Sequence, residues 1–480
     1  MGSTDTPVAN RSYDVVVVGC GMAGLAAGIA ASERGADVAV LEKSPREHRG
    51  GHLRFTESFR VPTADVEMDQ YDFDIPDYTP SEFYSDIMKV TNGRADPDLA
   101  KRLTEEAGPM IEWLTEHVEA QGMTWETQPP HPGYVAGRTW HDGEQFTEAL
   151  TDAAEDVGVD LFFESPARDL HRAPTGEVEA VDARVEDDLL RFEGDAIVLA
   201  SGAYESSAEK RTRYYGPGYE NMKVRGSRYN TGEVLEMALD VDAKATGEWS
   251  GAHMAIIDAM SPDVEGGITR IDGYQYGVMI NHEGERFVDE GEDARTQTYA
   301  KFGRRIFEQP FHEAFIVVDS KVVDDVAHMG PGRPITADSI EELANRLDVG
   351  DVEQTVETIE AFNESAEGTL DDYDPNVLDG MEAPDVDPRK SNWALPIDEP
   401  PYTGYPVTGG ITFGFGGVAV TPDAEVLDTS DRTIPGLYAA GNATGGLFYS
   451  NYPGGTGLTN AAVFGKIAGE EAADYVIAGG

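Results

Sequence analysis

The stretch VVVVGCGMAGLAAGIAASERGADVAVLEK, residues 15–43, decides the fold of this chain. It starts within a continuous apolar run, residues 12–18, that stops at Gly19, as expected for a parallel strand buried on both faces. Apolar residues then recur at helical spacing from Met22 to Arg34, and a second strand ends at Glu42. The order strand, helix, strand predicts a βαβ unit that opens an α/β domain.

Three glycines between the first strand and the helix, Gly19, Gly21 and Gly24, form a GxGxxG motif. Such glycines allow a tight turn and the close approach of a pyrophosphate, while the helix N-terminus supplies N–H donors and a partial positive charge. Glu42 stands where an acid binds the ribose hydroxyls of a dinucleotide. The motif alone could be an ordinary tight turn, but strand, helix and acid together predict a bound dinucleotide.

Two further glycine-rich regions favour FAD over NAD. Gly50 and Gly51 follow the second strand, where an NAD-binding domain normally begins another helix. Near the C-terminus, IPGLYAAGNATGG (434–446) ends a strand, and SNYPGGTGLTNAAVFGK (450–466) leads into a helix whose N-terminus would face the N1–C2=O edge of the isoalloxazine. A cofactor contacted from both chain ends is long. The predicted FAD-contacting residues are Gly19, Gly21, Met22, Ala23, Gly24, Glu42, Lys43, Gly50, Gly51, His52, Ala167, Ser201, Gly202, Gly441, Asn442, Gly457, Leu458 and Thr459.

The charge of the chain is strongly negative. Lys and Arg number 36 against 89 Asp and Glu, a formal net charge of −53, with the acids spread along the whole length. This balance excludes nucleic acid as a general partner because its phosphates would be repelled. The spread indicates a heavily solvated surface, of the kind that suits the high-salt cytoplasm of an extreme halophile, where salt screens the repulsion.

Cysteine and hydropathy patterns narrow the function further. Cys20 is the only cysteine, which excludes disulfides within the chain and iron–sulfur or CxxCH haem sites held by its own thiolates. No apolar run approaches the roughly 20 residues of a membrane span, and the polar start of the chain is unlike a signal peptide. We therefore expect a cytoplasmic protein that is not integral to a membrane and holds no metal.

The domain organisation is expected to be an FAD-binding domain interrupted by an insertion. Residues 1–244 would form the first part of that domain and 395–480 the second part. The segment 245–394 mixes strands, charged helices and a Pro/Asp-rich stretch, so we expect it to be a separate capping domain of α+β type. Further helices are expected over 80–120 and 143–157.

Several stretches, VVVVGCGMAGLAAGIAA, IVLASGAYE, ERFVDE and IPGLYAAGNATGG, resemble the flavoprotein subunits of fumarate reductase and succinate dehydrogenase. Within that family, VRGSRYNTGE, GITFGFGG and GGLFYSNYPGGTGLTNAAVFGKIAG are most similar to FAD-dependent tricarballylate dehydrogenases. The resemblance implies a glutathione-reductase-like, Rossmann-like FAD domain with a mobile capping domain and catalysis at their interface. Family members that attach FAD covalently carry a histidine several residues before the GG pair. Because His48 lies only two residues before Gly50, non-covalent FAD is expected.

The resemblance also implies catalytic residues. Arg295 matches the family arginine that exchanges a proton with the substrate, although one extra residue separates it from RFVDE; it could instead pair with Glu290 or Asp293. His253 matches a histidine that holds a substrate carboxylate, or it is an ordinary core histidine. Tyr452 replaces an arginine clamp of fumarate reductases.

The departures from fumarate reductases concern the substrate. Besides Tyr452, Phe413 stands where those enzymes have a histidine, so plain fumarate reduction is disfavoured. Other residues expected at the substrate site are the arginines of VRGSRYN, which can fork onto carboxylates, together with residues after the GG pair and in the C-terminal segments. They are Arg225, Arg228, Arg54, Thr56, Thr412 and Gly455, and Arg60 is placed to line the flavin face.

The leading hypothesis is a dehydrogenase that converts a small polycarboxylate, tricarballylate, to its C=C product, cis-aconitate. The alternatives are a fumarate-reductase-like ene-reductase, a 3-oxosteroid 1-dehydrogenase-like enzyme with Tyr452 acting on a ketone, and an FAD-binding protein without catalysis. With no thiolate-held redox centre of its own, the enzyme would pass electrons to a separate electron-transfer protein or a quinone-linked acceptor.

Overall fold

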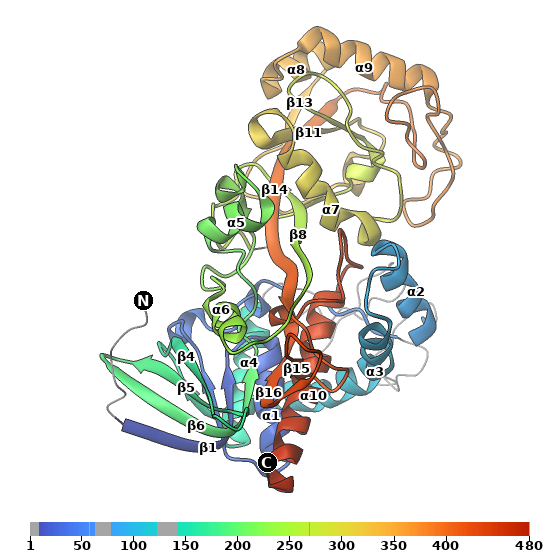
Figure 1. Ribbon diagram of the computed structural model, residues 1–480. Coiled ribbons are helices and arrows are strands. Elements are labelled where there is room, and N and C mark those ends of the chain that lie inside the picture. Colours follow the sequence, from blue (N-terminus) through green and yellow to red (C-terminus); the bar gives the residue numbers. More distant parts are fainter. Residues whose placement is uncertain (1–8, 57, 63–77, 122–142, 268, 480) are drawn as a thin grey trace. The chain divides into compact units, whose positions relative to one another are not determined.

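The protein is represented by a computed structural model that describes residues 9–56, 58–62, 78–121, 143–267 and 269–479. The chain divides into two compact units (Figure 1). The first unit comprises Met1–Glu220, Ser227–Ala252 and Phe413–Gly480, and the second unit comprises Asn221–Gly226 and His253–Thr412.

The second unit has different edges from the predicted segment 245–394. Strands β8 (Ala245–Asp258) and β14 (Tyr402–Val418) each continue through a boundary as one uninterrupted strand. The change of composition near 394 therefore marks the end of a loop inside the second unit. The short strand β7 (Lys223–Val224) also belongs to that unit, because it pairs in parallel with β14.

A mainly parallel sheet forms the centre of the first unit. Its strand order is β15-β16-β6-β1-β2-β3, and only β15 in this path runs antiparallel to its neighbour. Val15, Val16 and Val17 have no exposed surface, which explains the uninterrupted apolar run in the sequence. The bounds are β1 (Ala9–Val18), β2 (Val38–Leu41), β3 (Asp160–Phe162), β6 (Asp188–Leu199), β15 (Glu425–Leu427) and β16 (Thr433–Ala439). Strands β4 (Ala167–Arg172) and β5 (Val178–Val185) extend the sheet antiparallel to β6.

Helices α1 (Met22–Glu33) and α10 (Thr456–Ala478) lie side by side in the first unit (Figure 1). Glycines allow their backbones to touch: a Cβ added at Gly465 would lie 2.5 Å from the carbonyl oxygen of Ala23, and one at Gly469 would lie 2.2 Å from that of Ala27. The two glycine-rich loops at the ends of the chain thus begin two helices that pack against each other.

Two of the remaining helices of the first unit, α2 and α3, have clear start signals. Thr79 and Glu82 form a capping box at the start of α2, and Asp96 caps α3 by accepting hydrogen bonds from the amides of Asp98 and Leu99. The bounds are α2 (Pro80–Val90), α3 (Pro97–Ala120), α4 (Gly143–Asp156), α5 (Ala208–Tyr215) and α6 (Glu233–Asp240). No helix in the described part of the chain is long and apolar enough to cross a bilayer.

The second unit has its own sheet and its own apolar core. Strands run in the order β10-β11-β14-β13, all antiparallel, and β7 and β8 also pair with β14. Helices α8 and α9 contribute apolar side chains to this core, including Leu343, Leu347 and Phe362. The bounds are β9 (Ile271–Asp272), β10 (Val278–Ile280), α7 (Arg295–Phe307), β11 (Glu313–Val318), β12 (Ala327–His328), β13 (Ile335–Ala337), α8 (Ile340–Leu347) and α9 (Val352–Ser365).

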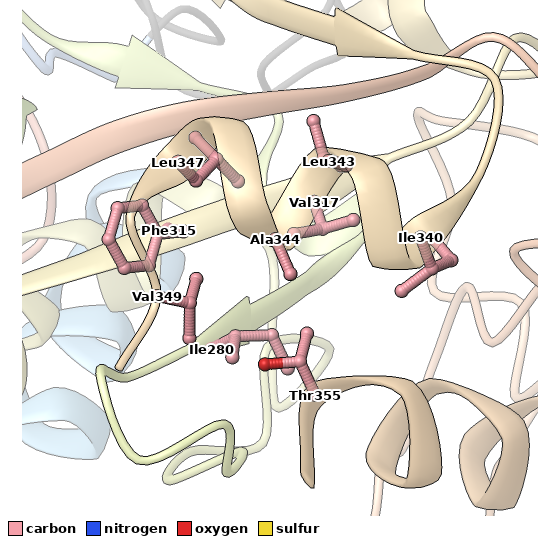
Figure 2. A pocket seen from close by; sticks show the side chains of 9 residues that line it. All are labelled: Ile280, Phe315, Val317, Ile340, Leu343, Ala344, Leu347, Val349 and Thr355. Carbon is pink, nitrogen blue, oxygen red and sulfur yellow. The ribbon is translucent and has the colours of Figure 1, made fainter. Parts of the chain in front are cut away.

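A small apolar cavity lies inside the core of the second unit (Figure 2). Side chains of α8, β10 and β11 point into it, and Thr355 is its only polar lining residue. A cavity of this lining offers no group for acid–base or redox chemistry. We regard it as a packing void of the core, and the candidate site lies elsewhere.

Candidate active site

The GxGxxG loop of the first unit needs its glycines for steric reasons. Gly19 has a φ of +111°, and a Cβ there would lie 2.5 Å from the carbonyl oxygen of Ala200. A Cβ at Gly24 would lie 1.8 Å from the carbonyl oxygen of Gly19. Gly21 is the N-cap of α1, and its side-chain position is 3.5 Å from the carbonyl oxygen of Gly50. The front loop therefore brings backbone N–H groups to a helix start with no side chain in the way.

Glu42 holds this loop in place. Its carboxylate accepts a hydrogen bond from the amide of Cys20 (2.9 Å) and another from the amide of Ser44 (2.7 Å). Each carboxylate oxygen can accept a second hydrogen bond, so the predicted contact with a ribose hydroxyl remains chemically open. The neighbouring Lys43 instead donates to Thr231 and forms a 3.1 Å ion pair with Glu233.

Buried polar groups close in sequence to the glycine loops match a polar cofactor. The hydroxyls of Ser44 and Ser201, the hydroxyl of Thr456 and the side-chain oxygen of Asn460 are buried without a hydrogen-bond partner among the described residues. They follow β2 and β6 or lie at the start of α10. Buried polar groups normally have partners. These four, with the glycine loops, fit a long polar ligand such as FAD.

The other predicted cofactor residues lie at turns of the first unit. Gly50, Gly51, Gly202 and Gly441 all have positive φ angles, between +54° and +93°. Such backbone is open to close approach by a ligand because no Cβ projects from it. His52 follows the GG pair, with its Nε2 atom 3.1 Å from Glu205 Oε1. The remaining predicted positions are Met22 and Ala23 in the first turn of α1, Ala167 at the start of β4, and Asn442 beside Gly441.

The rear loop is fixed by Arg60, whose role the sequence did not reveal. The Arg60 amide donates to Thr459 Oγ1 (3.0 Å), this hydroxyl donates back to the Arg60 carbonyl (2.8 Å), and Arg60 Nε donates to the Gly454 carbonyl (2.8 Å). Gly455 has a φ of +82° and leaves only 2.9 Å between its side-chain position and the Arg60 amide. The Thr459 hydroxyl is therefore engaged within the protein. Gly457 and Leu458 in the first turn of α10 are half-buried.

Aromatic rings surround Tyr452 in the first unit. Its ring makes edge-to-face contacts with Phe413 (5.4 Å between centroids) and Phe448 (5.5 Å), and Phe415 packs against Phe413 at 5.8 Å. The Tyr452 hydroxyl accepts a hydrogen bond from the Gly455 amide (3.2 Å). The two positions where the resemblance expected a histidine and an arginine thus form part of an aromatic cluster, defined by Phe413, Phe415, Phe448 and Tyr452.

A guanidinium cluster lies in the second unit. Arg295, the first residue of α7, donates from Nε to Asp272 Oδ1 (2.8 Å), and Arg270 Nε is 3.3 Å from Asp272 Oδ2. Burial alone would raise the pKa of Asp272, but the guanidinium groups of Arg295, Arg270 and Arg225 outweigh burial and hold that pKa below its usual range. The alternative pairing of Arg295 with Glu290 does not occur, because Glu290 pairs with Arg286 at 2.5 Å.

His253 is buried within reach of the same charges. Desolvation, and then the positive charges of Arg225, Arg270 and Arg295, lower its pKa well below the usual value, so the imidazole is neutral. The Tyr299 ring packs edge-to-face against it at 5.0 Å. His253 can therefore donate or accept a hydrogen bond, but it does not act as a cation.

The predicted substrate-binding residues separate into two groups. Arg225 is buried in the second unit, where its Nη1 donates to Thr412 Oγ1 (3.3 Å), and so joins the guanidinium cluster. Arg228 is exposed and belongs to the first unit. Arg54 donates to the Glu47 carbonyl (2.8 Å) and pairs with Glu144, and Thr56 donates to the Leu53 carbonyl (2.7 Å). These last two side chains are engaged with their own surroundings, and their substrate role stays a prediction.

Comparisons with known proteins agree with this geometry. Residues 14–458 match the FAD binding domain family. The vinyl phenol reductase of Lactiplantibacillus plantarum is 26% identical over 97% of this chain and 97% of that protein. The fumarate reductase (cytochrome) of Shewanella frigidimarina is 26% identical over 97% of this chain and 77% of that protein. The structure of 3-ketosteroid Δ1-dehydrogenase from Sterolibacterium denitrificans is similar to this one with a TM-score of 0.75 and 22% identity. The match covers 97% of this chain and 100% of that chain, and it shows likeness of fold.

These findings confirm three of the predictions. The fold class, an α/β FAD-binding domain with an additional unit, is as expected, the protein is an FAD-dependent oxidoreductase acting on CH–CH groups, and FAD is the cofactor. The narrower resemblance to tricarballylate dehydrogenases stays a prediction.

Proposed function

This chain belongs to the FAD binding domain family and is an FAD-dependent oxidoreductase acting on CH–CH groups, and we propose that its substrate is a small carboxylate. Bound FAD supplies or accepts the hydride at one carbon of the substrate. The residues of the chain must then hold the carboxylate and exchange a proton at the neighbouring carbon. The guanidinium cluster of the second unit carries this proposal.

The charge balance of the cluster supports anion binding. Two buried guanidinium groups, those of Arg225 and Arg295, and the half-buried guanidinium of Arg270 lie around the carboxylate of Asp272. An incoming carboxylate would be attracted by these positive charges and could accept paired N–H donors from a guanidinium. The neutral imidazole of His253 would add a hydrogen bond.

Arg295 is the proposed proton exchanger. Guanidinium is normally protonated at all working pH values. Proton exchange at Arg295 would require that burial and the two neighbouring arginines make its neutral form accessible. Asp272, which accepts a hydrogen bond from Arg295 Nε, would stabilise the protonated form that returns the proton. Asp272 also fixes the orientation of the guanidinium.

Two substrate types compete for this site. The sequence stretches favour tricarballylate, whose three carboxylates suit several guanidinium groups. The aromatic cluster around Tyr452 favours a second candidate, an unsaturated acid or ketone with an aromatic or apolar body, since edge-to-face ring contacts bind such groups. Similarity to a vinyl phenol reductase supports only the aromatic body of this second candidate, because a vinyl phenol has no carboxylate or ketone.

Anaerobic bleaching of the flavin distinguishes these candidates. The yellow holoenzyme, kept in high salt, is mixed with tricarballylate, with a 3-ketosteroid, and, after reduction, with fumarate or an arylacrylate. Bleaching by tricarballylate alone supports the polycarboxylate, reoxidation by an arylacrylate supports the aromatic acid, and bleaching by the steroid alone would overturn the carboxylate proposal. A protein that binds no flavin would contradict the family assignment itself.

A variant tests the proton exchanger. Arg295→Lys should keep FAD bound but lower turnover by roughly 10²–10⁴-fold, because a lysine cannot reproduce both the Asp272 contact and the proton transfer. Arg305→Lys is the matched control, since Arg305 is an exposed residue of the same helix that pairs with Glu308. Equal turnover of Arg295→Lys and wild type would remove Arg295 from the mechanism.

Electron acceptor and location are part of the same proposal. Reduced FAD would be reoxidised by a separate electron-transfer protein or a quinone-linked partner, and Cys20 is buried and offers no redox site. A cytoplasm of high salt is the proposed location, from the net charge of −53.

A further inference from the structure

A carboxylate, an imidazole and an amide meet in the interior of the first unit. Glu205 has no exposed surface, and its Oε1 lies 3.1 Å from His52 Nε2 and accepts a hydrogen bond from Asn230 Nδ2 at 2.9 Å. Asn230 Nδ2 is also 2.6 Å from His52 Nδ1. We name these three residues the Glu205 cluster. Its three members come from chain segments that are far apart in the sequence.

The cluster borders two of the glycine turns that fit FAD. A Cβ at Gly202 would lie 2.7 Å from Asn230 Nδ2, and one at Gly51 would lie 3.7 Å from Asn230 Oδ1. His52 directly follows that GG pair in the chain. The charge of the cluster therefore acts electrostatically at the backbone that is expected to contact FAD.

The surroundings of Glu205 leave its charge poorly compensated. Burial raises the pKa of Glu205 to about 7, although Asn230, the amides of Glu205 and Gly414, and Arg211 oppose this effect. Arg211 of α5 donates instead to the backbone carbonyls of Glu205 (2.7 Å), Tyr219 (2.9 Å) and Glu220 (2.6 Å).

Two titratable side chains face the carboxyl group besides Arg211. They are His52 and Tyr204, and burial raises the pKa of the Tyr204 hydroxyl above its usual range, so that it stays neutral. Oε2 of Glu205 is buried and has no hydrogen-bond partner of normal geometry among the described residues. Each carboxylate oxygen has two lone pairs, so Oε2 can take up a proton.

We propose that the Glu205 cluster is a proton acceptor coupled to reduction of the bound FAD. Two electrons from the substrate, or from a chemical reductant, and one proton reduce the flavin and leave it with one additional negative charge. That charge raises the proton affinity of the nearby buried carboxylate. A second proton, taken from solvent, then binds the Glu205 carboxylate or the imidazole with which it shares its hydrogen bonds. In total, two electrons and two protons are taken up, and on reoxidation both protons are released.

Proton uptake on reduction tests this inference without measuring turnover. The FAD-loaded protein is reduced photochemically in weakly buffered high salt, and a pH indicator counts the protons bound per two electrons. At pH 8, where Glu205 is mostly ionised before reduction, the wild type should take up about two protons. At pH 5.5, where Glu205 is already protonated, the extra proton should disappear. Protonation of the flavin itself would give the opposite trend, because it increases as the pH falls.

Variants identify the acceptor. Glu205→Gln should take up about one proton at pH 8, whereas Asp182→Asn should match the wild type. Asp182 also contacts a histidine, His171, at 2.8 Å, but the bonds from Arg191 and His171 outweigh its burial and keep its pKa below the usual range. Equal uptake by Glu205→Gln and wild type at pH 8 would overturn the proposal. If Glu205→Gln binds no FAD, the wild type alone decides. The proposal is then overturned if the number of protons that the wild type takes up per two electrons does not rise between pH 5.5 and pH 8.

Discussion

The two glycine-rich loops of the first unit begin helices that pack side by side, yet they are held in different ways. The front loop, Gly19–Gly24, is shaped mainly by its own glycines, as the 1.8 Å between the side-chain position of Gly24 and the Gly19 carbonyl shows, and Glu42 adds one hydrogen bond at Cys20. The rear loop, Asn451–Thr459, is held by a distant segment: Arg60 binds Gly454 and Thr459.

This difference explains why one loop tolerates changes in its residues better than the other. A loop shaped mainly by its own glycines presents N–H groups at the helix start without depending on distant side chains of the loop's surroundings for its shape, so it suits the pyrophosphate of the cofactor. A loop held by distant side chains can accept new residues, here Tyr452 and Phe413, without losing the helix start behind it. We therefore expect damage to the front loop to abolish cofactor binding and damage to the rear loop to be graded.

The largest effect is expected from Gly24→Ala. The new methyl group would strike the Gly19 carbonyl, and because the partner is backbone no side chain can move aside. We expect loss of bound FAD and a fall of more than about 4 kcal/mol in the free energy of unfolding, measured by flavin absorbance and denaturant titration. Gly35→Ala is the control: its φ is +90° with nothing within 4 Å, so only about 1 kcal/mol should be lost. Full FAD occupancy in Gly24→Ala would contradict the expectation that damage to the front loop abolishes cofactor binding.

An intermediate effect is expected from Arg60→Met. Removing the guanidinium leaves the partly buried Asp86 without its 3.0 Å ion pair and releases the Gly454 carbonyl. We expect a loss of about 3 kcal/mol in unfolding free energy and weaker FAD binding. Arg46→Met, which breaks an exposed pair with Glu155, should cost no more than about 1 kcal/mol. If the two variants cost the same in denaturant titration, Arg60 does not hold the rear loop.

The smallest effect is expected from Tyr452→Phe. The ring keeps its contacts with Phe413 and Phe448, and only the hydrogen bond from the Gly455 amide is lost. We expect about 1 kcal/mol less stability and unchanged FAD occupancy, measured by thermal unfolding and absorbance. Tyr452→Ala, which also removes the ring, should cost about 3–5 kcal/mol. A large effect of Tyr452→Phe would mean that the hydroxyl, and not the ring, organises this loop.

The sequence predicted the parts of the molecule that local pattern determines. Helices α1 and α4 fall within a residue or two of their expected positions, because apolar periodicity acts within one segment. The FAD-binding fold followed from GxGxxG for the same reason. The edges of the second unit could not be predicted in this way. Strands β8 and β14 continue through them, and strand composition does not change there.

The missed residues all act across long sequence separations. Asp272 lies 23 positions from its partner Arg295, Arg60 lies 399 positions from Thr459, and Asn230 lies 25 positions from Glu205 and 178 from His52. No periodicity connects such pairs. Lone charged or polar residues in these segments carry no signal of burial, so only the tertiary structure reveals which of them meet.

The reactivity of the single cysteine, Cys20, can report local opening of the front loop. The thiol is fully buried in the GxGxxG turn, and burial raises its pKa far above the usual range, so it is unreactive while the loop is closed. Alkylation must therefore wait for a local opening of the cofactor loop, and its rate measures the free energy of that opening. The rate of Cys20 alkylation therefore reports how often the cofactor-binding loop opens.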